Sequence, residues 1–168
     1  MKEFIQKHKL FSFYTALMLV IVFIAIFAPW LAPGDAFTSD MSKALQAPSA
    51  QHWFGTDKLG RDVLSRIIYG TQLSLFMGVS IVVIMVSIGT VIGAVAGYFG
   101  GKVEMVLMRL ADIMLSFPGV VLAIAIAGIL GGSIVNTILA LSVVGWAKYA
   151  RLVRSMTLKV RGEEYVTA

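Results

Sequence analysis

The chain of 168 residues is 58% hydrophobic and 14% charged, with a mean hydropathy of +0.87. Soluble domains are about a quarter charged, so this composition excludes an ordinary soluble domain and indicates an integral membrane protein. No cysteine is present, which excludes disulfides and cysteine metal sites, and the net charge of +5 comes from basic residues at the ends of apolar runs rather than from a nucleic-acid-binding surface.

Residues 1–31 comprise a basic tail and a first apolar run. The run, residues 11–31, matches the ~20 residues needed to cross a hydrocarbon core of ~30 Å. A cleaved signal peptide is the alternative, but its apolar core would be only ~7–15 residues long, and Pro29 and Pro33 make a poor cleavage region. We therefore predict a retained membrane-spanning helix.

Residues 32–72 form the only extended polar segment, which is too short for a domain. From residue 58 to residue 70, apolar positions 63, 64, 67 and 68 share one helical face, which predicts an amphipathic helix lying on the membrane surface. On such a helix Asp62, four residues before Arg66, would form a surface ion pair. Further along the chain, Arg109 and Asp112 are three residues apart and close enough to pair at the membrane edge.

Residues 73–98 are predicted to be the second span. Gly89, Gly93 and Gly97 recur every four residues and leave a smooth strip along one helical face. Because lipid tails compete equally well for apolar side chains, such strips usually mark close helix contact, although a substrate lining is the alternative.

Residues 113–147 carry no charge, yet as one helix they would be ~52 Å long, which exceeds the membrane core. Residues 131–133, two glycines and a serine, are the natural break between spans at 108–130 and 133–152, with a kink at Pro118. Four spans with a cytoplasmic N-terminus place ten of the 14 basic residues inside, whereas three spans would place five there. We therefore predict an all-α polytopic transmembrane bundle with four spans in this chain.

The last predicted helix becomes basic as it leaves the membrane. Gly162 interrupts this helix, and Glu163 and Glu164 are typical of the first turn of a new one, where carboxylates meet the positive end of the helix dipole.

No catalytic constellation is evident in the sequence. The turn at Lys102 lacks the glycine and hydroxyl residue of a nucleotide-binding loop, since Ala96 and Val103 occupy those positions. His8 and His52 are isolated and are expected to be surface residues, so no metal site and no cofactor are predicted. With no ionisable group deep in a span either, the chain would have to draw energy from a partner. The polar side chain of Asn136 is expected to form a hydrogen bond between helices.

Two separate motifs remain. One is GTDxxGRDxxSR before the second span, and it consists of Gly55, Thr56, Asp57, Gly60, Arg61, Asp62, Ser65 and Arg66. The other is the run at 146–154 followed by residues 164–168. Both resemble one family, the inner-membrane permeases of ABC importers of the dipeptide, oligopeptide and nickel class, and the second motif is similar to the approach to that family's EAA loop. The resemblance covers residues 51–168 and implies that the chain is the N-terminal portion of a six-span permease in the bacterial inner membrane.

The resemblance also implies an organisation and a set of partners. Residues 1–31 would be the cytoplasmic tail and first span, residues 32–72 the extracytoplasmic segment, and residues 73–168 the permease core. The implied partners are a second, different permease subunit, two cytoplasmic ATPases that hydrolyse ATP, an extracytoplasmic substrate-binding protein and the lipid bilayer. The implied ATPase-coupling segment consists of Gly162, Glu163, Glu164, Tyr165, Val166, Thr167 and Ala168.

The substrate class and two rival functions stay open. The sequence around Trp53 and Trp146 looks slightly closer to the nickel or metal-chelate branch than to the peptide branch. The first rival is a helical membrane scaffold or channel subunit that is not driven by ATP, for which the segment after Gly162 would tolerate change. The second is a membrane-embedded enzyme, which the missing nucleophile and acid motifs disfavour.

Overall fold

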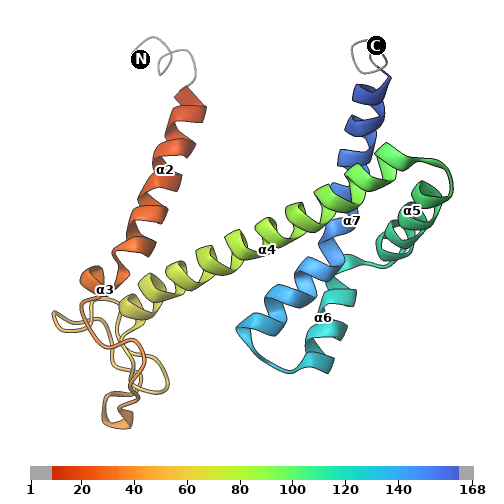
Figure 1. Cartoon of the computed structure of the whole chain (residues 1–168). Coiled ribbons are helices and arrows are strands. Elements are labelled where there is room, and N and C mark those ends of the chain that lie inside the picture. The colour runs from red at the N-terminus through yellow and green to blue at the C-terminus, as the bar shows by residue number, and fades with distance from the viewer. Residues whose placement is uncertain (1–8, 163–168) are drawn as a thin grey trace. The chain divides into compact units, whose positions relative to one another are not determined.

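The computed structural model describes residues 9–162, and within that range the chain is helical, with a single isolated β-bridge between Thr56 and Asp62. Figure 1 shows the elements in chain order. They are α2 (Lys9–Ile26), α3 (Ala28–Leu31), the 3-10 turn η1 (Met41–Lys43), α4 (Val63–Phe99), α5 (Gly101–Ser116), α6 (Gly119–Leu130) and α7 (Ile134–Arg161). The predicted all-α fold is confirmed. The chain divides into two compact units, residues 1–76 and 77–168, and α4 contributes to both.

In the first unit, α2 gives way to the short helix α3 at Phe27. Pro29 has no N–H to donate to the carbonyl of Ala25, so α2 cannot continue through it, but proline is well tolerated in the first turn of the new helix α3. The polar loop 32–62 follows.

Helix α4 begins at Val63 and continues for 37 residues, so the separate surface helix predicted at 58–70 is wrong. Asp62 caps the first turn by accepting a hydrogen bond from the Ser65 N–H at 2.7 Å. No proline interrupts the sequence between there and Phe99, and nothing else stops the helix. Residues 63–69 are therefore the first turns of the helix that contains the predicted second span. The extracytoplasmic position of residues 32–72 stays a prediction.

In the second unit, the predicted kink at Pro118 is a complete break. Phe117 has an extended backbone (φ −92°, ψ 146°), the conformation favoured before proline, and α5 and α6 meet at an angle of 91°. The proline therefore ends one helix and starts another.

The predicted break at residues 131–133 is confirmed. The Ser133 hydroxyl accepts a hydrogen bond from the Asn136 N–H at 3.1 Å, which caps α7. The Asn136 side chain donates to the Leu130 carbonyl at 2.6 Å and to the Gly131 carbonyl at 3.0 Å. Asn136 thus connects the end of α6 to the first turn of α7, at the junction of the two helices rather than in mid-span.

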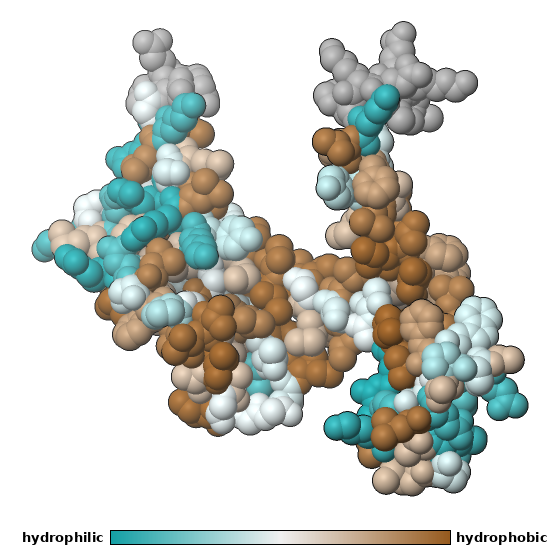
Figure 2. All heavy atoms as spheres, turned by 180° about the vertical axis from the view of Figure 1, so that it is seen from behind, coloured by the Kyte–Doolittle hydropathy of each residue, from teal (hydrophilic) through white to brown (hydrophobic). Residues whose placement is uncertain are grey.

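Within the described residues, α2 and α4 are long and apolar enough to cross a membrane, and the bent pair α5 and α6 adds a third span if it is counted as one. Helix α7, with 28 residues and a length of about 42 Å, is also long, but its second half is strongly basic and it does not meet the same criterion. Four spans therefore stays a prediction. In Figure 2, apolar residues cover α2, while hydrophilic residues gather over the loop after α3 and at the charged parts of α5 and α7.

Candidate functional site

The motif loop, residues 55–66, ends with the first turn of α4 and depends on two glycines with left-handed backbones. Gly55 has φ +71° and Gly60 has φ +74°. A Cβ atom added at Gly60 would lie 1.7 Å from the Asp40 carbonyl oxygen, and one at Gly55 would lie 2.4 Å from the Gln46 carbonyl oxygen. Both positions therefore require glycine, for the backbone conformation and for the close approach.

Asp62 is the buried centre of the loop, with only 2% of its surface exposed. Besides the Ser65 N–H, its carboxylate contacts Nδ1 of His52 at 3.0 Å, while the Ser65 hydroxyl accepts from the Gly34 N–H at 2.9 Å. Burial alone would raise the pKa of Asp62, but the hydrogen bonds from Ser65 and His52 outweigh it and hold this pKa below its ordinary value. The predicted Asp62–Arg66 ion pair is wrong, and His52 is not an isolated surface residue.

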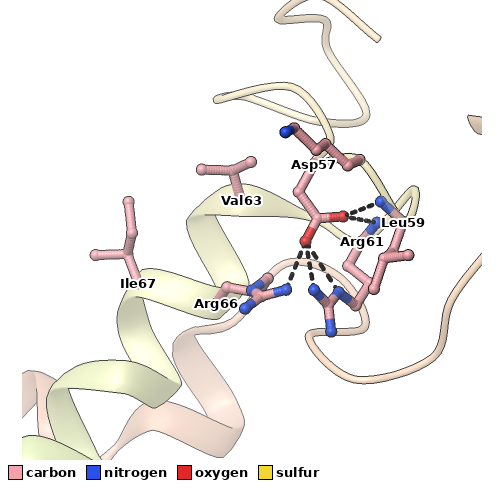
Figure 3. A pocket seen from close by; sticks show the side chains of 7 residues that line it. Asp57, Leu59, Arg61, Val63, Arg66 and Ile67 are labelled. Atoms are coloured by element: carbon pink, nitrogen blue, oxygen red, sulfur yellow. Dashed lines mark hydrogen bonds and ion pairs between the residues drawn. The ribbon is translucent and has the colours of Figure 1, made fainter. Parts of the chain in front are cut away.

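Asp57 forms ion pairs with both arginines of the motif (Figure 3). Its Oδ1 accepts from the backbone N–H groups of Leu59 and Arg61 at 2.8 and 3.0 Å, and its Oδ2 accepts from Arg61 Nε at 2.9 Å and from Arg66 Nη1. Burial raises the pKa of Asp57, but the hydrogen bonds from Arg61 and Leu59 together lower it well below its ordinary value. Arg66 therefore pairs with the carboxylate nine residues before it, across the turn.

The Thr56 hydroxyl completes the loop by accepting from the Gln46 N–H at 2.8 Å and donating to the Lys43 carbonyl. Each of the eight motif residues thus stabilises the loop, either by a hydrogen bond or ion pair or, for the two glycines, by adopting a left-handed backbone. Their spacing marks them as a set, but the partners Gly34, Lys43 and Gln46 lie outside the motif and cannot be identified from it.

The second region is the α7 contact face, where the three spaced glycines of α4 lie against α7. A Cβ atom added at Gly89 would lie 2.5 Å from Tyr149 Cβ, and one at Gly93 would lie 2.4 Å from the Ala150 carbonyl oxygen. At Gly97 it would lie 2.7 Å from Thr157 Cβ. The backbones therefore approach so closely that no side chain fits between them, the geometry that small residues allow between membrane helices.

Ion pairs join α5 to α7. Arg154 Nε donates to Glu104 Oε1 at 2.6 Å, and Arg151 pairs with Asp112. The predicted Arg109–Asp112 pair is therefore wrong, because Asp112 turns to the other helix. The residues of these two pairs are 50 and 39 positions apart in the chain, so helical spacing could not find them. The sequence did hold one indication of these pairs, since two acidic residues lie about two turns apart in α5 and arginines lie in the basic second half of α7.

The C-terminal end of α7 is fixed at two points. Arg161 Nη1 donates to the Tyr98 carbonyl at the end of α4 at 3.0 Å. The Gly162 N–H bonds to the carbonyls of Leu158 and Lys159 at 3.2 Å each and ends the helix. The other predicted coupling residues lie outside the described residues: Glu163, Glu164, Tyr165, Val166, Thr167 and Ala168. Between residues 9 and 162, no three His, Asp or Glu side chains gather in a way that could hold a metal ion.

Comparison with known proteins gives two family matches. Residues 89–168 match the model of the binding-protein-dependent transport system inner membrane component, and residues 5–48 match that of the N-terminal TM domain of oligopeptide transport permease C. The two matches lie at opposite ends of the chain and describe the same kind of protein.

Individual relatives are also permease proteins of transport systems. The chain is 43% identical over 164 residues, 98% of its length and 54% of the relative's, to the dipeptide transport system permease protein DppC of Alkalihalophilus pseudofirmus. It is 41% identical over 166 residues, again 98% and 54%, to the glutathione transport system permease protein GsiD of Escherichia coli strain 536. It is 39% identical over 149 residues, 89% and 54%, to the nickel transport system permease protein NikC of Escherichia coli K12. The chain thus spans about half the length of the curated relatives it matches.

Proposed function

The chain belongs to the family of inner membrane components of binding-protein-dependent transport systems, and we propose that it forms part of the translocation path of an ATP-driven importer. Members of this family are multi-pass membrane proteins with a permease role. The apolar surfaces of α2 and α4 support a membrane environment. Only 6% of the most apolar 18-residue stretch of each helix is buried within the chain, so the rest needs lipid or another subunit around it.

In the proposed assembly, this permease pairs with a second, different permease subunit. Two cytoplasmic ATPases supply the energy, and an extracytoplasmic substrate-binding protein delivers the solute. The N-terminus is cytoplasmic in this proposal, supported by the gathering of Lys and Arg residues in the tail, around Lys102 and along the end of α7. Residues 163–168 would then meet the ATPases.

The observation that carries the proposal is how α7 is attached. The glycine strip holds one face of α7 to α4, the ion pairs of Arg151 and Arg154 hold it to α5, and Arg161 fixes its end. A push on the segment after Gly162 would therefore move α7, α5 and the adjoining part of α4 as one body. Closure of the ATPases on ATP would in this way favour one of two packings, inward-open or outward-open.

The transported solute is proposed to be a peptide or a nickel chelate. The relatives named for dipeptide, glutathione and nickel transport have identities of 43%, 41% and 39%, a range too narrow to separate the classes. The described residues offer no metal-holding cluster, so selection between these solutes is assigned to the binding protein.

The decisive experiment is Ala168→Arg in the intact permease, expressed with its partner subunits. If residues 162–168 dock on the ATPase, a long charged side chain there disrupts the contact, and both ATPase co-purification and solute uptake fall by about tenfold or more, the loss expected for an interface residue worth at least 1.4 kcal/mol.

Ser155→Arg is the matched control, because it introduces the same side chain at an exposed position of α7. Ser155→Arg should leave both measurements close to wild type. If Ala168→Arg also leaves them unchanged, the coupling proposal fails and a scaffold or channel subunit that does not use ATP becomes the better description.

A further inference from the structure

Residues of the motif loop line an open pocket of about 700 Å³ (Figure 3). Its lining combines three basic side chains, Lys58, Arg61 and Arg66, with apolar side chains that include Val63 and Ile67. This combination of grouped cations and an adjoining apolar wall suits an amphiphilic anion.

The cations of the pocket are only partly neutralised. Asp57 is its one acidic residue, and both of its carboxylate oxygens already accept hydrogen bonds. Arg61 gives Asp57 its Nε and Nη2 groups and Arg66 gives its Nη1 group, so each guanidinium keeps other N–H donors. Lys58 forms no ion pair among the described residues. Asp57 thus holds two arginines side by side while the lining keeps a formal charge of +2.

The pocket also lies where the chain changes from polar to apolar. Ile67 on its wall is 52% exposed, and residues 67–101 carry no charge. Trp53 and Phe54, exposed at 63% and 57%, come directly before the motif loop in the chain. Aromatic side chains next to basic ones are typical of the headgroup level of a membrane, where each has one apolar and one wet side.

We propose that this pocket binds the headgroup of an anionic phospholipid. The phosphate accepts hydrogen bonds from Lys58, Arg61 and Arg66, and the start of the acyl chains lies along Val63 and Ile67. The apolar wall favours a lipid over an acidic patch of a soluble protein, which would leave Ile67 without an apolar partner. The proposal goes beyond transport and does not depend on it.

The test measures binding of phosphatidylglycerol to the intact permease by native mass spectrometry, after purification in a neutral detergent. Lys58→Gln should weaken this binding about fivefold, as expected for removing one cation near a headgroup, and Arg66→Gln should weaken it by a similar factor. Phosphatidylcholine should bind weakly to every variant. Arg66→Gln also removes a partner of Asp57, so Lys58→Gln, which breaks no ion pair, provides the cleaner test.

Lys43→Gln is the matched control. Lys43 lies in the polar loop 32–62 and carries the same charge as Lys58, but it pairs with Asp40 at 3.2 Å and does not line the pocket. Lys43→Gln should leave the affinity for phosphatidylglycerol within about twofold of wild type, because surface pairs contribute little.

Three outcomes would overturn the proposal. Equal losses of phosphatidylglycerol affinity in Lys43→Gln and Lys58→Gln would mean that the lipid is attracted by the positive surface in general and not by the pocket. Equal competition by soluble glycerol phosphate would mean that the apolar wall takes no part and that the ligand is a free phosphate ester. The third outcome is that Lys58→Gln leaves phosphatidylglycerol binding unchanged but weakens capture of the substrate-binding protein in phosphatidylcholine nanodiscs. The pocket would then be a protein-docking surface.

Discussion

The motif loop and the α7 contact face are held together in opposite ways. In the loop, polar side chains supply the contacts: Asp57 and Thr56 accept hydrogen bonds from irregular backbone, and Asp62 accepts one from the first turn of α4. On the face, backbones meet because side chains are missing, as at Gly93. The loop should therefore be damaged most by deleting side-chain atoms, and the face by adding them.

The difference follows from what each region must satisfy. An irregular backbone has N–H and C=O groups without helical partners, and buried ones must find substitutes. Helices α4 and α7 already satisfy their own backbones, so their association depends on close packing over small residues, with a hydrogen bond from Arg161 to the Tyr98 carbonyl at one end.

The largest effect is expected from Gly93→Leu. The new side chain would begin 2.4 Å from the Ala150 backbone oxygen, and neither helix backbone can yield at that point without separating from the other. Overpacking costs typically 1–3 kcal/mol, and we expect about 3 kcal/mol or more here because a backbone atom is the obstacle. Thermal unfolding of the intact permease in detergent measures the loss.

Gly78→Leu is the control in the same helix, since a Cβ atom there meets nothing within 4 Å. It should leave the stability of the helical unit within about 0.5 kcal/mol, the usual range for exposed substitutions. Equal unfolding temperatures for Gly93→Leu and Gly78→Leu would contradict the described packing of α4 on α7.

The next largest effect is expected from Asp62→Ala in the loop. The change leaves the Ser65 N–H and His52 without their acceptor in a buried site, which costs about 1–3 kcal/mol. Hydrogen exchange of residues 52–66 should accelerate, while exchange in α6 and α7 stays as in wild type.

Asp35→Ala provides the comparison for Asp62→Ala. Asp35 also accepts backbone hydrogen bonds, from Phe37 and Thr38, but it is exposed, and water can replace it. Its removal should change exchange at residues 52–66 far less. Similar acceleration by both variants would mean that burial of Asp62 is not what holds the loop.

Much of the fold could be predicted because apolar runs and breakers act locally. Pro118 and residues 131–133 end helices through their own backbone chemistry, so the sequence alone located both positions, although it predicted only a kink at Pro118. The spacing of Gly89, Gly93 and Gly97 predicted a packing face, but not that α7 would be the helix against it.

What could not be predicted depends on partners far apart in the chain. Helical spacing suggested that Asp62 pairs with Arg66 and Asp112 with Arg109, yet Asp62 faces His52 and Asp112 faces Arg151. A short-range pair is only one of several that a charged residue can form, and surface pairs gain so little that tertiary geometry decides between them. The same limit explains the wrong prediction of a separate helix at residues 58–70. Helix α4 begins at Val63 because Asp62 caps it, and the position of Asp62 depends on the fold of the loop.

A smaller effect is expected at the edge of the α7 contact face, in the ion pair of Glu104 and Arg154. Their side chains are 22% and 35% exposed, so a double-mutant cycle with Glu104→Gln and Arg154→Gln should give a coupling energy of about 1 kcal/mol. Thermal unfolding in detergent at low and high salt measures it, and screening should reduce it at high salt. A coupling energy near zero at low salt would remove this pair as a link between α5 and α7.

The smallest effect is the pH response of the loop. Hydrogen bonds hold the pKa values of Asp57 and Asp62 below the ordinary value of about 3.9, so these groups stabilise the loop at pH values above it and lose that contribution as the pH falls through their folded pKa values. Exchange protection at residues 52–66, corrected for intrinsic rates, should be flat from about pH 7 to pH 5 and should decline below about pH 4. Asp57→Asn with Asp62→Asn should have lower protection at neutral pH and no such decline. An equal acid decline in that double variant would assign the pH dependence to other groups.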